Sequence, residues 1–207
     1  MRVERIEASK HKKDRILVFL EDGACLKITE QELLDFGLRS GDELDEEALK
    51  RLKEAAGVSN TRAAAADLIG KRAMSRLCLE RKLREKGASE AEARYAAEWL
   101  EAIGALNDAE YAAALARHYG GMGYGPARVR EKLYEKGIPR ELWEDALDGL
   151  EPDESRLDKL ARQKLRGAEP TRENLKKVSD YLARRGYGWE EISAALDRIR
   201  ADWPDGA

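Results

Sequence analysis

Residue types that commonly bind metal ions or act as nucleophiles are few and scattered in this chain. The only histidines are His11 and His118, and neither has neighbours suited to nucleophilic or metal chemistry. The two cysteines, Cys25 and Cys78, lie far apart and lack the C-x-x-C spacing of a metal site. Cys78 falls within a helical pattern and is typical of a small buried residue. We therefore expect binding rather than catalysis, with no metal ion and no cofactor.

The one glycine-rich stretch, Gly120-Gly-Met-Gly-Tyr-Gly125, is a second place to look for ligand chemistry. Loops that cradle phosphate follow a strand and end in Gly-Lys and then Ser or Thr, and this stretch does neither. It predicts a flexible connection into a helix that starts at Pro126, because proline suits the first turn of a helix. Tyr124, at the edge of the stretch, is a candidate to stack on a base or to fill a partner's pocket.

The composition is that of a soluble protein with a large charged surface. Of 207 residues, 38% are charged and 43% hydrophobic, but only 6% are aromatic, and the formal net charge is -3. No apolar run approaches the roughly 18 residues that a membrane span needs. The N-terminus lacks the apolar core of a signal peptide, and the cysteines suggest no disulfide framework. We expect a cytosolic protein that does not enter membranes.

The balanced total hides a segregation of charge along the chain. Residues 71–86 contain seven basic and two acidic residues, whereas residues 88–101 contain one basic and four acidic. Basic excess returns in 156–166 and 172–185, and acidic excess returns in 138–151 and 187–205. We therefore expect each helical unit to present a basic helix and an acidic one.

A repeated pattern accounts for this alternation. The segments Leu83-Arg-Glu-Lys-Gly87, Leu133-Tyr-Glu-Lys-Gly137 and Leu182-Ala-Arg-Arg-Gly186 share the form L-x-x-[KR]-G, and their leucines are 50 and 49 residues apart. Apolar residues also recur four positions before each leucine and ten after each glycine. Constant spacing of this kind marks a repeated supersecondary unit. We expect three units of about three helices each, with the leucine helix ending at the glycine.

The basic residues of the leucine helices fall on one face. Arg128, Lys132 and Lys136 recur every four residues and therefore form a stripe beside the core positions. Such a stripe suits a phosphate backbone or an acidic protein groove, but ordinary solvated cations with nearby glutamates would give the same pattern. Including the other two repeats and their flanks, the candidate contacts are Lys71, Arg72, Arg76, Lys82, Lys86, Tyr124, Arg128, Lys132, Lys136, Lys177, Tyr181 and Arg185.

The elements that position these residues are mainly helical, behind a small β-containing module. Residues 16–20 and 24–28 predict a hairpin around a type I′ turn at Asp22-Gly23, and residues 3–6 predict a third strand. Helices are expected over 30–36 and from Asp45 to about Ala56. The predicted organisation is an N-terminal module over 1–57 and helical repeats over 58–104, 105–150 and 151–207.

Local signals mark the ends of the expected helices. Ser89 with Glu92, and Asn107 with Glu110, have the spacing of capping boxes. Pro126, Pro139 and Pro152 suit first turns, and Gly87, Gly104, Gly137 and Gly186 suit helix ends. The four tryptophans, at positions 99, 143, 189 and 203, are expected to be packing anchors.

The second unit resembles a known family. The segments Leu106-Asn-Asp-Ala-Glu-Tyr-Ala112, Gly123-Tyr-Gly-Pro126 and Leu133-Tyr-Glu-Lys-Gly-Ile138 are similar to the central motif of the RecX family of bacterial regulatory proteins. Residues 75–87 look like the opening repeat of that family. The third unit matches more loosely, since it lacks a close copy of the Asn-Asp segment. The resemblance covers about residues 60–200.

The resemblance implies tandem three-helix units in an elongated, curved arrangement. It implies a protein that binds the RecA recombinase and its filament on single-stranded DNA, and that reduces ATP hydrolysis, strand exchange and co-protease activity during DNA repair. We expect the protein to be a monomer. Direct DNA contact is compatible with the basic stripe. The resemblance carries no strict active-site residues, so the candidate contacts rest on charge alone.

Two other functions fit the same residues. A helical-repeat protein could bind nucleic acid directly without a recombinase, although a reader of duplex sequence would need Arg, Asn or Gln aimed at bases. A plain scaffold could recognise another protein through the acidic faces. Tight binding to bare DNA would favour the first, and an enzyme is the class that the sequence supports least.

Overall fold

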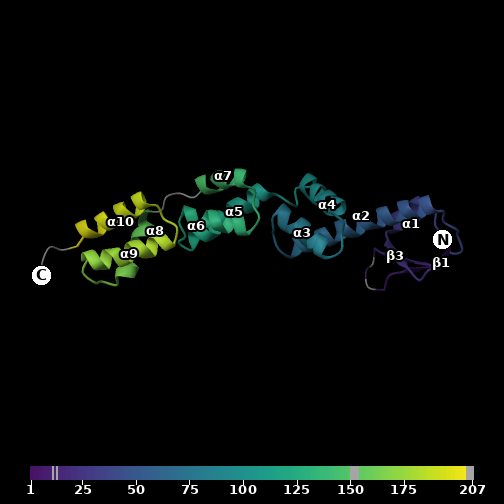
Figure 1. The fold of residues 1–207 in the computed structure, drawn as a ribbon, viewed down its shortest axis with the longest axis horizontal. Coiled ribbons are helices and arrows are strands. Elements are labelled where there is room, and N and C mark those ends of the chain that lie inside the picture. Colours follow the sequence, from purple (N-terminus) through teal and green to yellow (C-terminus); the bar gives the residue numbers. More distant parts are fainter. Residues whose placement is uncertain (11, 13, 150–153, 204–207) are drawn as a thin grey trace. The chain divides into compact units, whose positions relative to one another are not determined.

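The computed structural model describes residues 1–207 except 11, 13, 150–153 and 204–207. His11 and Pro152 therefore lie outside the described residues. The chain forms two compact bodies, an N-terminal half over Met1–Leu106 and a C-terminal half over Asn107–Ala207. It is mainly helical, with one small sheet at the N-terminus (Figure 1). Within the described residues, no helix combines the length and apolarity needed to cross a membrane.

The N-terminal sheet has three antiparallel strands, β1 (Val3–Ala8), β2 (Ile16–Leu20) and β3 (Cys25–Ile28), in that order. The pairing of Val18 with both Ile6 and Leu26 fixes the register. Alternate side chains point to one face, where Val18, Leu20 and Ile28 are fully buried. All three predicted strands are confirmed.

The hairpin turn is not the predicted type I′ turn. Gly23 has a φ of +82°, but Asp22 does not have a positive φ. The Gly23 amide donates to the carbonyl of Leu20, and the Leu20 amide donates to the carbonyl of Ala24, both at 2.9 Å. The loop therefore has three residues with glycine in the left-handed position. The Asp22 carboxylate accepts from the Ala24 amide at 2.9 Å, a local bond that favours this wider turn.

Two helices follow the sheet, α1 (Glu30–Asp35) and α2 (Glu46–Lys71). The predicted end of the second at Ala56 is wrong, because the helix continues for fifteen more residues. It packs Leu52 and Ala56 against the sheet and Ala65 into the first repeat. Gly57 and the β-branched residue that follows are unfavourable in a helix, but tertiary packing on both sides outweighs that. The domain boundary at 57 stays a prediction, and α2 runs through it.

The first repeat combines the second half of α2 with α3 (Arg76–Glu85) and α4 (Glu90–Ala102). Its core includes Leu79, Leu83 and Ala97, the positions at which the repeated pattern places apolar residues. The predicted capping box of Ser89 and Glu92 is confirmed in both directions.

The second repeat contains α5 (Asp108–Gly121), α6 (Pro126–Glu135), the short helix η1 (Arg140–Leu142) and α7 (Trp143–Asp148). Asn107 caps α5 by accepting from the Glu110 amide at 3.1 Å. Pro126 lies in the first turn of α6, as predicted, whereas Pro139 precedes η1 as its cap residue. The core of this repeat is built on Leu115, Val129 and Leu133.

The third repeat contains α8 (Glu154–Leu165), α9 (Arg172–Arg184) and α10 (Trp189–Ala201). Its core includes Val178, Leu182 and Leu196. The four glycines predicted at helix ends all have positive φ values, from 71° at Gly104 and Gly137 to 96° at Gly87. Of the tryptophans, Trp99, Trp143 and Trp203 pack against cores. Trp189 does not, because its side chain is 72% exposed at the start of α10.

Candidate partner-binding surfaces

In the second repeat, Arg128 and Lys132 of the basic stripe are paired with carboxylates of their own helix. Arg128 contacts Glu131, and the Nζ atom of Lys132 lies 2.6 Å from Glu135. The hydrogen bond from Lys132 lowers the pKa of Glu135. Outside the stripe, Arg130 reaches across to Glu144 on α7 with two hydrogen bonds, of 3.0 and 2.8 Å. The positive charge of α6 is therefore largely balanced within the repeat.

In the third repeat, all three stripe positions, Lys177, Tyr181 and Arg185, have structural contacts. Lys177 lies 2.8 Å from Glu173, and the hydrogen bond between them lowers the pKa of that glutamate. The ring of Tyr181 lies between cations, with Arg185 at 5.0 Å and Lys164 at 5.4 Å from its centroid. Ring and cation at such distances attract one another, so Tyr181 is not a free stacking platform.

Arg185 and Tyr124 lie where the second and third repeats meet. One guanidinium nitrogen of Arg185 donates to the carbonyl oxygens of Met122 at 3.0 Å and Gly123 at 3.1 Å. The same guanidinium lies 5.7 Å from the ring centroid of Tyr124. The glycine-rich stretch is thus held by hydrogen bonds from another repeat, and it is not the loose connection predicted from sequence.

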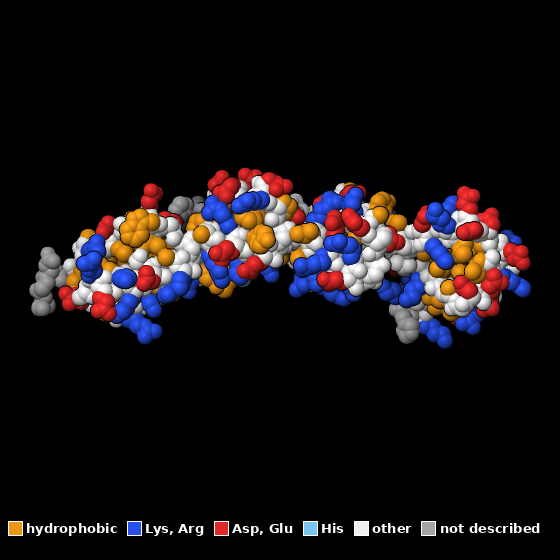
Figure 2. Space-filling model, viewed as in Figure 1, with side chains coloured by type: hydrophobic (Ala, Val, Ile, Leu, Met, Phe, Trp, Pro, Cys, Tyr) orange, Lys and Arg blue, Asp and Glu red, His pale blue; other side chains and the backbone are white. Residues whose placement is uncertain are grey.

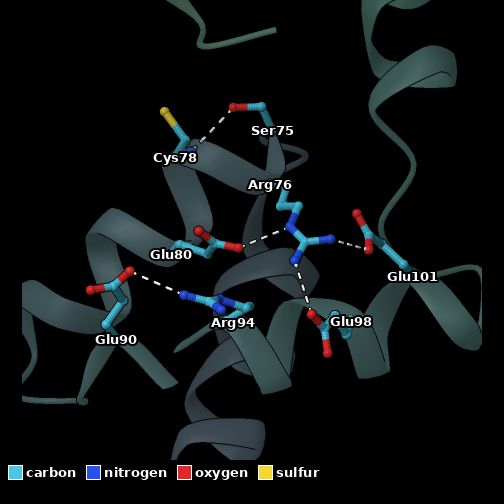
Figure 3. Close-up of polar contacts among 8 residues, drawn as sticks. All are labelled: Ser75, Arg76, Cys78, Glu80, Glu90, Arg94, Glu98 and Glu101. Atoms are coloured by element: carbon cyan, nitrogen blue, oxygen red, sulfur yellow. Dashed lines mark hydrogen bonds and ion pairs between the residues drawn. The ribbon is translucent and has the colours of Figure 1, made fainter. Parts of the chain in front are cut away.

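Arg76 in the first repeat is also engaged internally (Figure 3). Its guanidinium lies 2.9 Å from Glu80, 2.7 Å from Glu101 and 3.4 Å from Glu98, and so joins α3 to α4. The hydrogen bond that Arg76 donates to Glu80 is the largest cause of a raised Arg76 pKa. Figure 3 shows the three carboxylates converging on this one side chain. Arg76 therefore stabilises the repeat and is poorly placed to leave for a partner.

Arg81 and Arg94 of the first repeat pair with Glu85 and Glu90, but a second group of its cations has no such partner. Among the residues that the structure describes, no carboxylate lies within ion-pair distance of five basic side chains on α2, α3 and their ends: Lys71, Arg72, Lys82, Arg84 and Lys86. All are exposed except Lys82, which is half-buried. Figure 2 shows Lys and Arg side chains gathered along the edge of the first repeat near α3. Arg84 was missed by the sequence analysis because it lies off the four-residue stripe.

A cavity of about 730 Å³ lies within the C-terminal half, lined by the second and third repeats. Tyr124, Leu147 and Tyr187 provide apolar and aromatic walls, and Arg117 and Glu191 provide charges of both signs. Among the described residues, no group of three or more His, Cys, Asp or Glu side chains is arranged to hold a metal ion. The charged helix faces are therefore the stronger candidates for binding a macromolecule.

The chain is a helical-repeat protein, because tandem three-helix units with segregated charge follow its small N-terminal sheet. The sequence profile described as the second three-helix domain of RecX matches residues 107–147. The profile of the third three-helix domain of RecX matches residues 152–196. Both matches fall in the C-terminal half, on the second and third repeats as the structure builds them.

Relatives with similar sequences and structures identify the family. Regulatory protein RecX of Pseudomonas entomophila is 34% identical over 137 residues, which span 65% of this chain and 88% of that protein. Its counterpart in Bacillus licheniformis is 27% identical over 212 residues, which span 99% of this chain and 80% of that protein. A crystal structure of a regulatory protein RecX superposes with a TM-score of 0.75 at 25% identity, covering 95% of this chain and 98% of that one. The chain belongs to the RecX family of regulatory proteins.

Proposed function

We propose that this protein binds the RecA recombinase on single-stranded DNA and inhibits the filament's ATP hydrolysis, strand exchange and co-protease activity. Membership of the RecX family supports a regulatory role, and the resemblance of the second repeat to the family's central motif supports the choice of partner. The protein acts by binding, without chemistry of its own.

The observation that carries the proposal is the group of five cations in the first repeat that have no carboxylate partner. A phosphate backbone is attracted by cations whose charge is not already balanced nearby. Arg128, Lys132 and Lys177 are paired with helix neighbours, although exposed pairs of this kind are worth only about 0–1 kcal/mol and exchange readily. The proposal therefore assigns the main DNA contact to the first repeat, with weaker contributions from α6 and α9.

The acidic faces suit a second contact in the same complex. A recombinase must present positive charge to hold DNA, and α4 and α7 carry mainly acidic exposed residues. Cationic and acidic surfaces in one chain let it contact both components of a nucleoprotein filament, and linked weak contacts reinforce one another through effective concentration.

A salt titration of binding tests the proposal. The fluorescence anisotropy of a labelled dT oligonucleotide is measured with this protein alone and then with preformed RecA filaments. We expect weak, salt-sensitive binding to the bare oligonucleotide and tighter binding to the filament. Binding to filaments that does not change between low and high salt would contradict the electrostatic contact.

The second candidate, direct binding of nucleic acid without a recombinase, rests on the same five cations. It predicts that the protein binds the bare oligonucleotide as tightly as it binds the filament. The two titrations above therefore distinguish the candidates in one set of measurements.

A further inference from the structure

The second and third repeats are joined through backbone atoms. The amide of Gly125 donates to the carbonyl of Arg185 at 2.8 Å, and the amide of Ala127 donates to the carbonyl of Gly186 at 3.1 Å. The first amides of a helix have no partner within the helix, and Gly125 has no side chain with which to cap α6. The third repeat therefore supplies part of the N-terminal cap of a helix in the second.

Two glycines make this approach possible. A Cβ atom on Gly125 would lie 2.5 Å from the carbonyl carbon and oxygen of Gly186. A Cβ atom on Gly186 would lie 2.4 Å from the backbone nitrogen of Arg128. Both neighbours are backbone atoms, which cannot turn aside as a flexible side chain can. Only glycine at both positions allows these two segments of the backbone to come this close.

Side chains of the third repeat extend the same junction. Arg185 donates to the carbonyls of Met122 and Gly123, and Arg156 donates to the carbonyl of Gly120 at 2.8 Å. The Gly120 carbonyl also accepts from the Gly123 amide at 2.9 Å, so Arg156 adds a second donor at the end of α5. Two arginines thus tie the glycine-rich stretch to α8 and α9.

We propose that the second and third repeats act as one rigid binding body, and that Gly125, Gly186 and Arg185 are its positioning residues. Tyr124, Tyr181 and Arg185 then serve recognition indirectly, by fixing the spacing between α6 and α9. A partner that contacts both helices does not bear the entropic cost of aligning them. The role of this rigid body in binding the filament rests on the proposed function, whereas the rigidity of the two repeats does not depend on it.

The substitution Gly125→Ala tests the junction with little local strain. Gly125 has φ and ψ of -79° and 170°, which alanine adopts freely, so the added methyl group clashes only with the third repeat. Gly121→Ala is the matched control, because a Cβ atom there would meet nothing within 4 Å. Arg185→Ala, with the exposed neighbour Arg184→Ala as its control, tests the junction by a second route.

Spin labels on α5 and α9 measure the distance between the second and third repeats directly. Cysteines replace the exposed residues Ala114 on α5 and Ala183 on α9, in a chain with Cys25→Ser and Cys78→Ala. Double electron–electron resonance should give one narrow distance distribution for the parent chain and both controls. The distribution should broaden for Gly125→Ala and Arg185→Ala, while circular dichroism shows that the helices remain. A distribution that stays narrow in both variants would overturn the rigid-body assignment.

Filament inhibition then tests the functional part. If both repeats engage the filament at once, loss of fixed spacing should raise the half-inhibiting concentration by about tenfold or more. A broadened distribution with unchanged inhibition would show that the repeats bind independently, which overturns the functional part alone. If the parent chain does not inhibit at all, the proposed function fails, and the distance measurement still decides the rigidity.

Discussion

Glu92 occupies the space that a side chain at position 57 would need: a Cβ atom on Gly57 would lie 1.9 Å from its Oε1 atom. Its other carboxylate oxygen accepts from the amide and the hydroxyl of Ser89, at 2.7 and 2.8 Å, in the capping box of α4. The helix shared with the N-terminal sheet is therefore fitted closely to the cap of the helix packed against it.

This contact predicts a coupling between the two positions. Gly→Ala in a helix is worth about 1 kcal/mol, and loss of a cap costs about as much. In the parent chain, Gly57→Ala displaces the Glu92 side chain from the cap of α4. The gain in helix stability and the loss of the cap should therefore nearly cancel in the free energy of unfolding. In a Glu92→Ala background the same change should stabilise by about 1 kcal/mol. Urea unfolding of the parent, the two single variants and the double variant measures this double-mutant cycle. An equal effect of Gly57→Ala on the free energy of unfolding in both backgrounds would show that the two residues do not interact.

The repeat leucines should dominate stability. Leu133 is fully buried, so Leu133→Ala should lower the free energy of unfolding by about 2–5 kcal/mol. Its neighbour Tyr134 is 75% exposed, and Tyr134→Ala should change the free energy of unfolding by less than about 0.5 kcal/mol. Chemical denaturation of the two variants tests this, and similar losses would mean that Tyr134 is not a surface residue.

A third prediction concerns the acid titration of Glu135. The hydrogen bond from Lys132 lowers its pKa in the folded chain, so the stabilisation is present above the ordinary glutamate pKa and is lost as pH falls through the lowered value. Lys132→Ala should raise the pKa of Glu135 toward the ordinary value. Carboxyl NMR titration measures it, with Glu144 as internal control because Arg130 lowers the pKa of that group independently. A pKa of Glu135 that stays low would exclude Lys132 as the cause.

Features of the fold that have a local or periodic cause could be predicted from the sequence. The leucines at 83, 133 and 182 share a spacing, and each is buried as that spacing predicts. The capping box at Ser89 needs only four consecutive residues, and it forms as expected. Features of this kind can be found from one sequence because all their determinants lie within one helix or one repeat.

The remaining features depend on contacts between distant residues. Gly125 and Gly186 are 61 positions apart, and nothing in either segment shows that the two backbones meet. The extension of α2 past Ala56 depends on cores on both sides of the helix, which local propensity does not reveal. The basic residues were visible, but the balance of Arg76 depends on another helix, because its guanidinium contacts Glu98 and Glu101 of α4. Placement of the twelve candidate contacts against DNA or protein stays a prediction.

The basic residues of the first repeat give a further prediction. Replacing Lys82, Arg84 and Lys86 with alanine should reduce the slope of log affinity against log salt, for the single-stranded oligonucleotide, by about 2 if all three contact phosphates. Replacing Arg128, Lys132 and Lys136 makes the matched control in the second repeat, and its effect should be smaller. Equal effects of the two triple variants would contradict the assignment of the main DNA contact to the first repeat.

Regulation of RecA is measured most simply as DNA-dependent ATP hydrolysis of RecA on single-stranded DNA, titrated with this protein from well below one molecule per recombinase. We expect inhibition at substoichiometric amounts, and weaker inhibition by the folded variant with Lys82, Arg84 and Lys86 replaced by alanine. ATP hydrolysis that is unchanged at equimolar protein would contradict the proposed function.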